Sequence, residues 1–375
     1  MIALQRTDQF VGRTMNWLYD HLRVLPRYTP LVLCDTLANR LEFPELEART
    51  LDRDRLGRRI WRRLAGRRLY PPDRIWLRRV APRVLHSHFG YVASQDLLLA
   101  QALGVPWIVS FYGADLYELG RQEGWRRRYA AVFRRATKVL ALGPVMASSL
   151  ETLGCPSHKV AIHPLGVDVD QLPYQRRLLQ PGEPLRLLFA GTFREKKGLQ
   201  YVVEGVAQAR KMGVQLELQL VGGAQGKPGD RETADAVSRL INERGIEDVV
   251  KRSGFLEFDQ LMKLALCSHV FVGPSVTAAD GDAEGTPFVL QQMMTTGMPC
   301  IATEHSDIPY LFGDARTMLV PERDGAAIAD RIQRYWKAPA MLAADGDRLR
   351  QQVRAHFDVR LCAERLAQLY DRLLC

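Results

Sequence analysis

Short apolar runs alternate with helix-like stretches along most of the chain. In the first half, apolar runs at 105–111 and 138–142 are each followed by a stretch of helical composition. The alternation restarts at 185–190 and 215–221. Strands that alternate with helices predict parallel sheets covered on both faces. Further strands are expected at 159–164, 249–253, 269–273, 299–303 and 317–320.

A proline-rich stretch, 171–184, interrupts this alternation and is typical of a linker. A chain of 375 residues is too long for one typical core, so we expect two doubly wound, Rossmann-like α/β domains that face each other across a ligand cleft. The expected bounds are 1–177 for the N-terminal domain and 178–350 for the C-terminal domain. A last helical stretch, 339–374, closes the chain, and its final part, 351–375, is expected to pack back on the N-terminal domain.

The composition is that of a globular protein, with 47% hydrophobic residues. No apolar run approaches the roughly 18 residues of a membrane-spanning helix, and the first ten residues lack the layout of a signal peptide. The six cysteines are scattered and form no Cys-x-x-Cys pair, which favours reduced thiols in the cytoplasm over disulfides or a zinc site.

Positive charge is concentrated in the first half of the chain. Residues 1–180 carry 28 Lys and Arg against 16 Asp and Glu, a net +12, whereas residues 181–375 carry 24 against 26, a net −2. The densest run lies in 51–83, where apolar positions 56, 60 and 64 have helical spacing. Such a helix could lie on an anionic membrane surface, or it could be a solvated helix with an ordinary core stripe. Its candidate membrane-facing residues are Arg58, Arg59, Arg62 and Arg63. No nucleic-acid signature accompanies the charge, so a nucleic-acid partner is not expected.

Polar clusters follow two neighbouring strands of the first half. His86 and His88 end one strand, and Tyr112, Gly113 and Asp115 follow the next. Ligands of parallel α/β sheets bind beyond the carboxyl ends of the strands, where these residues are expected. A single histidine at a strand end is more often structural, so each residue alone is weak evidence for a site.

A polar loop at 280–287 precedes an apolar, helix-like run at 288–294. The free amides and positive dipole end of such a helix can hold a phosphate, while the carboxylate of Glu284 can accept hydrogen bonds from sugar hydroxyls. The alternative is a capped helix packed on a sheet, with Glu284 complementing its N-terminus.

Five segments of the sequence together resemble a known enzyme family. They are His-Pro-Leu-Gly-Val-Asp at 163–168, Phe-Ala-Gly-Thr-Phe-Arg-Glu-Lys-Lys-Gly-Leu at 189–199, Leu-Val-Gly-Gly at 220–223, Glu-Gly-Thr-Pro at 284–287 with Gly-Met-Pro at 297–299, and His-Ser-Asp-Ile-Pro at 305–309. In this order and spacing they resemble the family 4 (group 1) retaining glycosyltransferases of GT-B fold, particularly those that build bacterial exopolysaccharide or lipopolysaccharide.

The resemblance implies roles for specific residues. Lys197 and Arg194 would grip the diphosphate of a nucleotide-sugar donor, and Glu284 would hydrogen-bond the donor sugar, which makes these three the catalytic candidates. Cations placed in advance stabilise the negative charge that builds on a departing diphosphate. Further donor contacts are implied for Gly191, Phe255, Gly285, Thr286, Pro287 and Gln292. On the acceptor side we expect His88, Tyr112 and Asp115.

The implied reaction moves a sugar from a UDP- or GDP-sugar to a carbohydrate or lipid-linked acceptor, on or near the inner face of the cell membrane. No cofactor is expected. Asp280-Gly-Asp282 resembles the Asp-x-Asp metal motif of another glycosyltransferase fold, but cationic side chains already serve the phosphate. We therefore expect no metal and assign the pair to shaping the loop before Glu284.

Three residues depart from the family pattern. Gln292 replaces the second glutamate of the Glu, seven residues, Glu spacing, and its amide can still bind ribose hydroxyls. Thr192 replaces the usual arginine after the glycine, and Tyr112 replaces a histidine. Two alternatives therefore stay open, a nucleotide-sugar epimerase of the same fold and a weakly catalytic scaffold subunit of a polysaccharide assembly complex.

Overall fold

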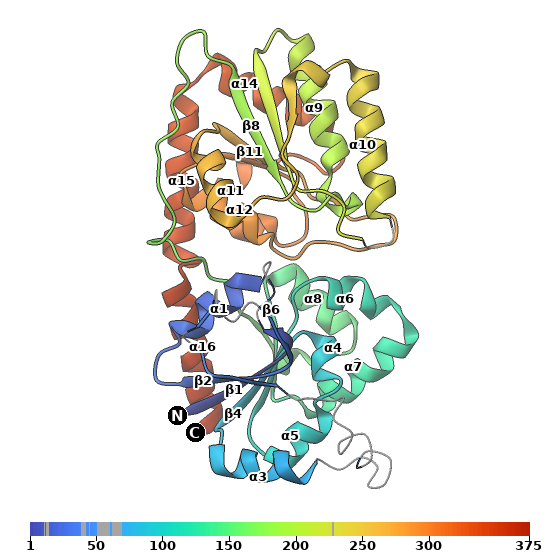
Figure 1. Ribbon diagram of the computed structural model, residues 1–375, viewed down its shortest axis with the longest axis vertical. Helices are drawn as coiled ribbons and strands as arrows, with labels where there is room; N and C mark the ends of the chain where they lie inside the picture. Colours follow the sequence, from blue (N-terminus) through green and yellow to red (C-terminus); the bar gives the residue numbers. More distant parts are fainter. Residues whose placement is uncertain are drawn as a thin grey trace. The chain divides into compact units, whose positions relative to one another are not determined.

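The computed structural model of the protein describes residues 1–10, 12, 15–38, 43–44, 46–50, 61, 70–226 and 229–375. Their contacts divide the chain into two compact units. Unit 1 comprises Met1–Gly166 and Val359–Cys375, and unit 2 comprises Val167–Asp358. Each unit is built around one parallel sheet (Figure 1).

The sheet of unit 1 has a doubly wound topology. Its strands are β1 Ile2–Phe10, β2 Thr29–Leu37, β3 Ala48–Thr50, β4 Val84–His88, β5 Trp107–Ser110, β6 Lys138–Ala141 and β7 Val160–Ile162. They lie in the order β3-β2-β1-β4-β5-β6-β7, and every neighbouring pair is parallel. Strands β4 and β5 are buried along their whole length, as expected for central strands covered on both faces.

Helices cover both faces of this sheet. They are α1 Asn16–Arg23, α3 Pro71–Val80, α4 Gly90–Ala93, α5 Leu97–Leu103, α6 Ala114–Tyr117, α7 Glu123–Arg135, α8 Pro144–Thr152 and α16 Val359–Leu374. Apolar residues at helical spacing place α7 on one face, where Tyr129, Val132 and Phe133 are buried. The opposite face is covered by α16, whose Leu366 and Tyr370 share a core with the first strand (Figure 1).

The closing helical stretch is two helices rather than one. Helix α15, Ala340–His356, belongs to unit 2, whereas α16 belongs to unit 1. Phe357 is buried in the core of unit 2 and Val359 is buried as well. The break therefore lies where the chain leaves unit 2 for unit 1, at 358/359 rather than at the expected 350/351.

The sheet of unit 2 repeats the same topology with five strands. They are β8 Leu185–Ala190, β9 Leu216–Val221, β10 Val250–Arg252, β11 Val270–Gly273 and β12 Cys300–Ala302, in the parallel order β10-β9-β8-β11-β12. Its other helices are α9 Leu199–Lys211, α10 Asp230–Arg244, α11 Phe258–Leu266, α12 Phe288–Thr295, α13 Ile308–Phe312 and α14 Gly325–Lys337. Helices α9, α10 and α14 share one core, and α11, α12, α13 and α15 share the core on the other face (Figure 1).

Two expectations about unit 2 differ from the structure. The boundary lies at 166/167 instead of 177/178 because the intervening residues pack on unit 2: Val169 and Leu172 enter its core, and the buried guanidinium of Arg177 donates to the carbonyl oxygen of Ala265 at 3.1 Å. The strand expected at 317–320 is wrong. A 3₁₀ turn at Gly313–Met318 takes its first two residues, and only Val320 pairs, with Thr303.

The order of strands reverses between β1 and β4 in unit 1 and between β8 and β11 in unit 2. Crevices at the carboxyl ends of the strands at such reversals are where doubly wound sheets bind ligands. In unit 2 the loops at this point are 191–198 after β8 and 274–287 after β11. Among the described residues, no helix combines the length and apolarity needed to cross a membrane.

Candidate active site

The loop after β8 brings Lys197 to the reversal point of the unit 2 sheet. Its last residue, Gly198, has φ +67°, and a Cβ there would lie 1.9 Å from the carbonyl oxygen of Pro274. A glycine is therefore required for the loop to rest on the start of the loop that carries Glu284. Helix α9 begins directly after this contact, which fixes the position of Lys197.

The backbone of Glu284 is held by a histidine. Its N–H donates to Nε2 of His305 at 3.1 Å, and Nδ1 of the same ring lies 2.6 Å from Oε1 of Glu322. Because Nε2 accepts, the ring proton is on Nδ1 and is donated to Glu322. The second oxygen of Glu322 accepts the N–H of Thr277 at 3.1 Å, so these contacts fix both ends of the loop.

The Glu284 carboxylate lies between two lysines. Its Oε1 is 3.1 Å from Nζ of Lys197 and 3.2 Å from Nζ of Lys196, and the side chain is 13% exposed. Burial raises the pKa of the Glu284 carboxyl, but the two ammonium groups outweigh burial and hold that pKa well below its usual range. Glu284 is therefore a fixed anion, suited to accept hydrogen bonds from sugar hydroxyls.

Arg194 reaches the same cluster through an aspartate. Its Nη2 lies 2.9 Å from Oδ2 of Asp282, and its Nε lies 3.6 Å from Oδ1 of Asp230. Asp282 is buried and also contacts Nζ of Lys196 at 3.1 Å, while Asp280 accepts the backbone N–H of Asp282. The Asp-Gly-Asp segment thus binds cationic side chains and its own backbone. No cluster of His, Cys, Asp and Glu suited to a metal ion occurs among the described residues.

The expected donor-binding residues lie around this cluster. Gly191 follows β8, and a Cβ there would lie 3.8 Å from Cδ and Cε of Lys197. Phe255 is 56% exposed, and its ring edge lies 3.4 Å from where a Cβ of Gly223 would be. The loop that enters α12 contains Gly285, Thr286 and Pro287. The Thr286 hydroxyl is buried without a hydrogen-bond partner among the described residues, and Gln292 is buried on α12.

In unit 1, Asp115 braces two strand-end loops. Its Oδ2 accepts the N–H of Gly90 at 2.9 Å, and its Oδ1 accepts the amides of Tyr112 and Gly113 at 2.9 and 3.0 Å. The carboxylate is 2% exposed and is directed at the backbone. It holds the loop after β4 against the loop after β5.

His88 and Tyr112 belong to a continuous chain of hydrogen bonds. The Tyr112 hydroxyl lies 2.6 Å from Nδ1 of His88, and Nε2 of His88 lies 3.0 Å from Oε1 of Gln5. Gln5 donates onward to the Tyr370 hydroxyl at 3.4 Å, which lies 2.7 Å from Nδ1 of His86. Tyr112 can therefore donate to His88, and Tyr370 on α16 completes the chain.

Burial keeps the histidines of this region neutral. It lowers the pKa of His88 to about 3 and the pKa of His21 to about 4. The pKa values of His86 and His163 are also well below the usual value, because of burial and then neighbouring imidazoles. The four rings line one small, largely apolar cavity at the carboxyl ends of β4 to β7.

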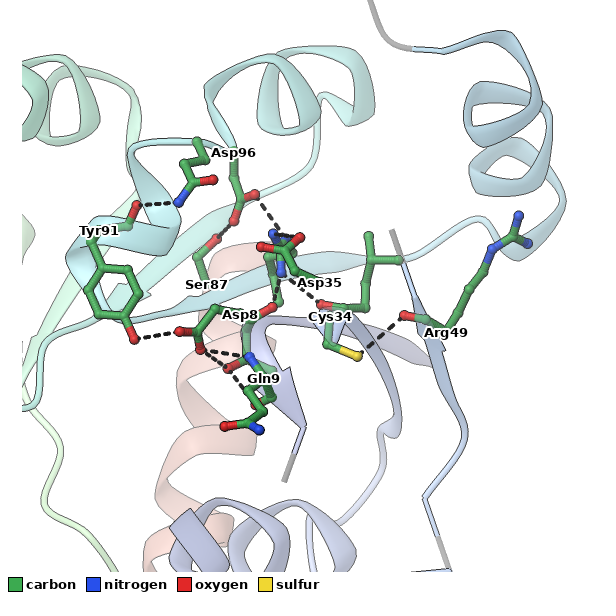
Figure 2. Close-up of polar contacts among 12 residues, drawn as sticks. Asp8, Gln9, Cys34, Asp35, Arg49, Ser87, Tyr91 and Asp96 are labelled. Carbon is green, nitrogen blue, oxygen red and sulfur yellow. Dashed lines mark hydrogen bonds and ion pairs between the residues drawn. The ribbon is translucent and has the colours of Figure 1, made fainter. Parts of the chain in front are cut away.

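A buried ion network at β1 and β2 was not anticipated from the sequence. The Arg6 guanidinium, fully buried, contacts Asp35 at 2.7 Å and Asp96 at 3.0 Å. Figure 2 shows Asp96 accepting from Ser87, and Asp8 accepting from the Tyr91 hydroxyl at 2.9 Å. The run of five polar residues at 5–9 in β1 was the available signal, since a strand buried on both faces is normally apolar.

The structure therefore groups Glu284, Lys197 and Arg194 with Lys196, to which no role was assigned from the sequence. It groups His88 and Tyr112 in unit 1, with Asp115 behind them. The arginines expected at a membrane surface, Arg58, Arg59, Arg62 and Arg63, lie outside the described residues.

Two family models match adjoining parts of the chain. The model described as "Glycosyltransferase Family 4" matches residues 21–171, and that described as "Glycosyl transferases group 1" matches residues 170–354. The chain belongs to the group 1, family 4 glycosyltransferases. The resemblance based on the five motif segments is confirmed. The segment 163–168 lies within the first match, and the other four, between 189 and 309, lie within the second.

Curated members of this family are similar in sequence. The putative colanic acid biosynthesis glycosyltransferase WcaL of Escherichia coli (strain K12) is 32% identical over 265 residues, 70% of this chain and 63% of the relative. The amylovoran biosynthesis glycosyltransferase AmsK of Erwinia amylovora is 29% identical over 294 residues, 76% of this chain and 69% of the relative. The match thus spans less than two thirds of WcaL.

Solved structures confirm the GT-B fold of this glycosyltransferase family member. Anabaena HepE in complex with UDP and glucose has a TM-score of 0.79 at 16% identity, covering 99% of this chain and 100% of that one. Sucrose-phosphate synthase from Thermosynechococcus elongatus has a TM-score of 0.78 at 18% identity, covering 100% and 99%. At these identities the likeness shows the fold alone.

Proposed function

We propose that this protein transfers a sugar from a UDP- or GDP-sugar to a carbohydrate or lipid-linked acceptor in the synthesis of a cell-surface polysaccharide, with retention of the anomeric configuration. The observation that carries the proposal is the ionised, largely buried Glu284 beside Lys197 at the reversal point of the unit 2 sheet. The names of WcaL and AmsK support an exopolysaccharide product.

In the proposed reaction, the bond between the sugar C1 and the diphosphate oxygen breaks, and its electron pair stays on the diphosphate. The acceptor hydroxyl oxygen forms the new bond to C1, and its proton goes to an oxygen of the leaving diphosphate. Lys197 and the amides at Gly285 and Thr286 stabilise the charge that develops on the diphosphate. Glu284 binds the hydroxyls of the donor sugar.

Two further residues are assigned to the nucleotide of the donor. Phe255 offers an exposed aromatic face for the base, and the buried Gln292 offers an amide for ribose hydroxyls. The hydroxyl of Thr286, which has no partner in the described part of the chain, is assigned to the donor, because a buried hydroxyl without a partner costs about 1–3 kcal/mol until a ligand satisfies it.

On the acceptor side we assign Tyr112 and His88 to contact with the acceptor and Asp115 to holding their loop. The Tyr112 hydroxyl donates to His88, so its oxygen can accept from an acceptor hydroxyl. This arrangement supplies a hydrogen bond and no charged base, in keeping with proton transfer to the leaving diphosphate.

We also assign a peripheral position on the inner membrane face, supported by the net +12 of residues 1–180. Co-sedimentation with vesicles that contain anionic phospholipid tests it. Replacing Arg58, Arg59, Arg62 and Arg63 with glutamate is expected to abolish binding, and unchanged binding would remove the assignment.

The test of the transfer reaction is release of nucleoside diphosphate from UDP- and GDP-sugars, with and without a lipid-linked acceptor pool. Wild type is expected to release diphosphate only with acceptor, and Glu284→Gln to lose at least about a hundredfold in rate. Glu243→Gln, an exposed change on α10, is the matched control. Conversion of the donor sugar without acceptor would identify an epimerase instead, and no turnover by wild type would favour a scaffold subunit.

A further inference from the structure

Lys196 is buried, and all the contacts of its ammonium group are with other residues of the protein. Its Nζ lies 3.1 Å from Oδ1 of Asp282, 3.2 Å from Oε1 of Glu284 and 3.4 Å from the carbonyl oxygen of Ala283. An ammonium group has three hydrogens, so these three acceptors account for all of them. Burial lowers the pKa of Lys196, but Glu284 and Asp282 outweigh burial and raise that pKa, so the group stays charged.

Lys197 has a different set of contacts. Within the described part of the chain, its ammonium group pairs with Glu284 at 3.1 Å and has no other partner. Its side chain is 19% exposed, about twice the value for Lys196. Two hydrogens of Lys197 therefore remain for an incoming anion, whereas none remains on Lys196.

The two lysines share one oxygen of Glu284. Both contact Oε1, and Oε2 has no partner among the described residues. Two contacts on a single oxygen define the orientation of the carboxylate and leave its second oxygen for a ligand hydroxyl. Removing the buried contact would let the carboxylate rotate towards Lys197 alone.

The anchor of Lys196 is itself held. Asp282 pairs with Arg194 at 2.9 Å, and Arg194 pairs with Asp230 at 3.6 Å, which gives alternating charges from Glu284 to the start of α10. The backbone adds to this: the N–H of Val276 donates to the carbonyl oxygen of Lys196 at 2.9 Å. The loops after β8 and β11 are thus joined on both sides of Lys196.

We infer that Lys196 is a positioning residue that orients Glu284 for the donor sugar, with Arg194 and Asp282 as its support, and that Lys197 alone of the two lysines binds the donor diphosphate. This inference rests on the proposed function. It moves Arg194 from the diphosphate-binding group to the supporting group, because its guanidinium contacts two carboxylates.

The test compares Lys196→Met with Lys197→Met in steady-state transfer. Lys196→Met is expected to lower kcat about a hundredfold, the effect typical of a misplaced catalytic group, while the donor KM changes less than about threefold. Lys197→Met is expected to raise the donor KM about tenfold or more, because it removes a charged hydrogen bond to the diphosphate. Lys196→Arg should recover part of the lost kcat. Lys211→Met, on the far end of α9, is the matched control.

Equal rises in donor KM for the two methionine variants, with kcat unchanged, would overturn the inference. If Lys196→Met fails to fold, Asp282→Asn removes the second anchor of the same ammonium group, and it should lower kcat without raising the donor KM. A raised KM in that variant would also overturn it.

Crystal structures of wild type and Lys196→Met without ligand separate this inference from the proposed function. The Glu284 carboxylate should leave its wild-type position in the variant. An inactive wild type whose Glu284 still moves in the variant would refute the function alone. An active wild type whose Glu284 stays in place in the variant would refute the positioning role alone.

Discussion

Replacing His21 by leucine tests how the buried imidazoles couple the stability of unit 1 to pH. His21 lies on α1 and is 6% exposed, and its Nε2 has no hydrogen-bond partner among the described residues. Its ring packs edge to face on His163 at a centroid distance of 5.1 Å. A proton added to either ring would be both desolvated and close to the other ring.

The size of the effect follows from the two pKa values of His21. Burial lowers the folded-state pKa to about 4, and the unfolded chain has an ordinary value of about 6.5. The unfolded state therefore takes up a proton first as pH falls, so this stability is fully present above about pH 6.5 and is lost towards pH 4. The loss is about 2 kcal/mol at pH 5 and about 3.4 kcal/mol below pH 4.

The assay is urea denaturation at pH 7.5 and pH 5, followed by tryptophan fluorescence. Five of the six tryptophans, at positions 17, 61, 76, 107 and 125, belong to unit 1, so the signal reports mainly that unit. The wild-type loss of unfolding free energy between the two pH values should exceed that of His21→Leu by about 2 kcal/mol. The other buried histidines are present in both proteins, so their contributions cancel apart from the part of their pKa shifts that His21 itself causes.

His158→Leu, an exposed position, is the control and should leave the pH dependence unchanged. At pH 7.5, His21→Leu should change stability by less than about 1 kcal/mol, because no hydrogen bond at Nε2 is lost. Equal losses in wild type and His21→Leu would refute the reasoning, since His21 would then accept its proton in the folded state.

Three further changes have expected outcomes. Gly198→Ala should destabilise unit 2 by about 2–4 kcal/mol in thermal or urea unfolding, because it combines a positive φ with a backbone clash; Gly182→Ala, with φ +80° and open space, should cost only about 1 kcal/mol. Asp115→Asn should cost about 1–3 kcal/mol, since an amide NH₂ would face a backbone N–H, and unchanged melting would contradict the hydrogen bonds described. Tyr370→Phe should speed amide exchange in α16 by removing the hydroxyl next to His86, whereas equal protection would show that apolar packing alone holds the helix.

Much of the fold could be predicted because its strands are buried on both faces. β8 has the predicted bounds 185–190, since a central parallel strand is a continuous apolar run between polar ends. The 317–320 segment has a similar composition but lies beyond the edge strand β12, where a single pair, Thr303 with Val320, is all that forms. The composition of a segment does not show whether a neighbouring strand is available to pair with it.

The site could be predicted only as far as local motifs reach. Glu284 and Lys197 lie in recognisable segments, whereas the contacts of Lys196 depend on Asp282, 86 residues away in the chain. The same holds for Arg6, whose partners Asp35 and Asp96 come from other elements. Contacts between residues so far apart in the chain depend on the fold, so no local sequence motif predicts them.

The chain crosses between the units twice, so that unit 2 is one continuous segment and unit 1 is made of two. During synthesis, every residue of unit 2 is added before α16, so unit 1 still lacks that helix when the chain of unit 2 is complete. Until then the face of the first sheet that carries Ala3, Val84 and Ile108 has no cover, and Gln5 and His86 lack Tyr370. The N-terminal half of this protein is therefore completed after the C-terminal half, and a chain that ends before α16 would expose an apolar surface to chaperones and proteases.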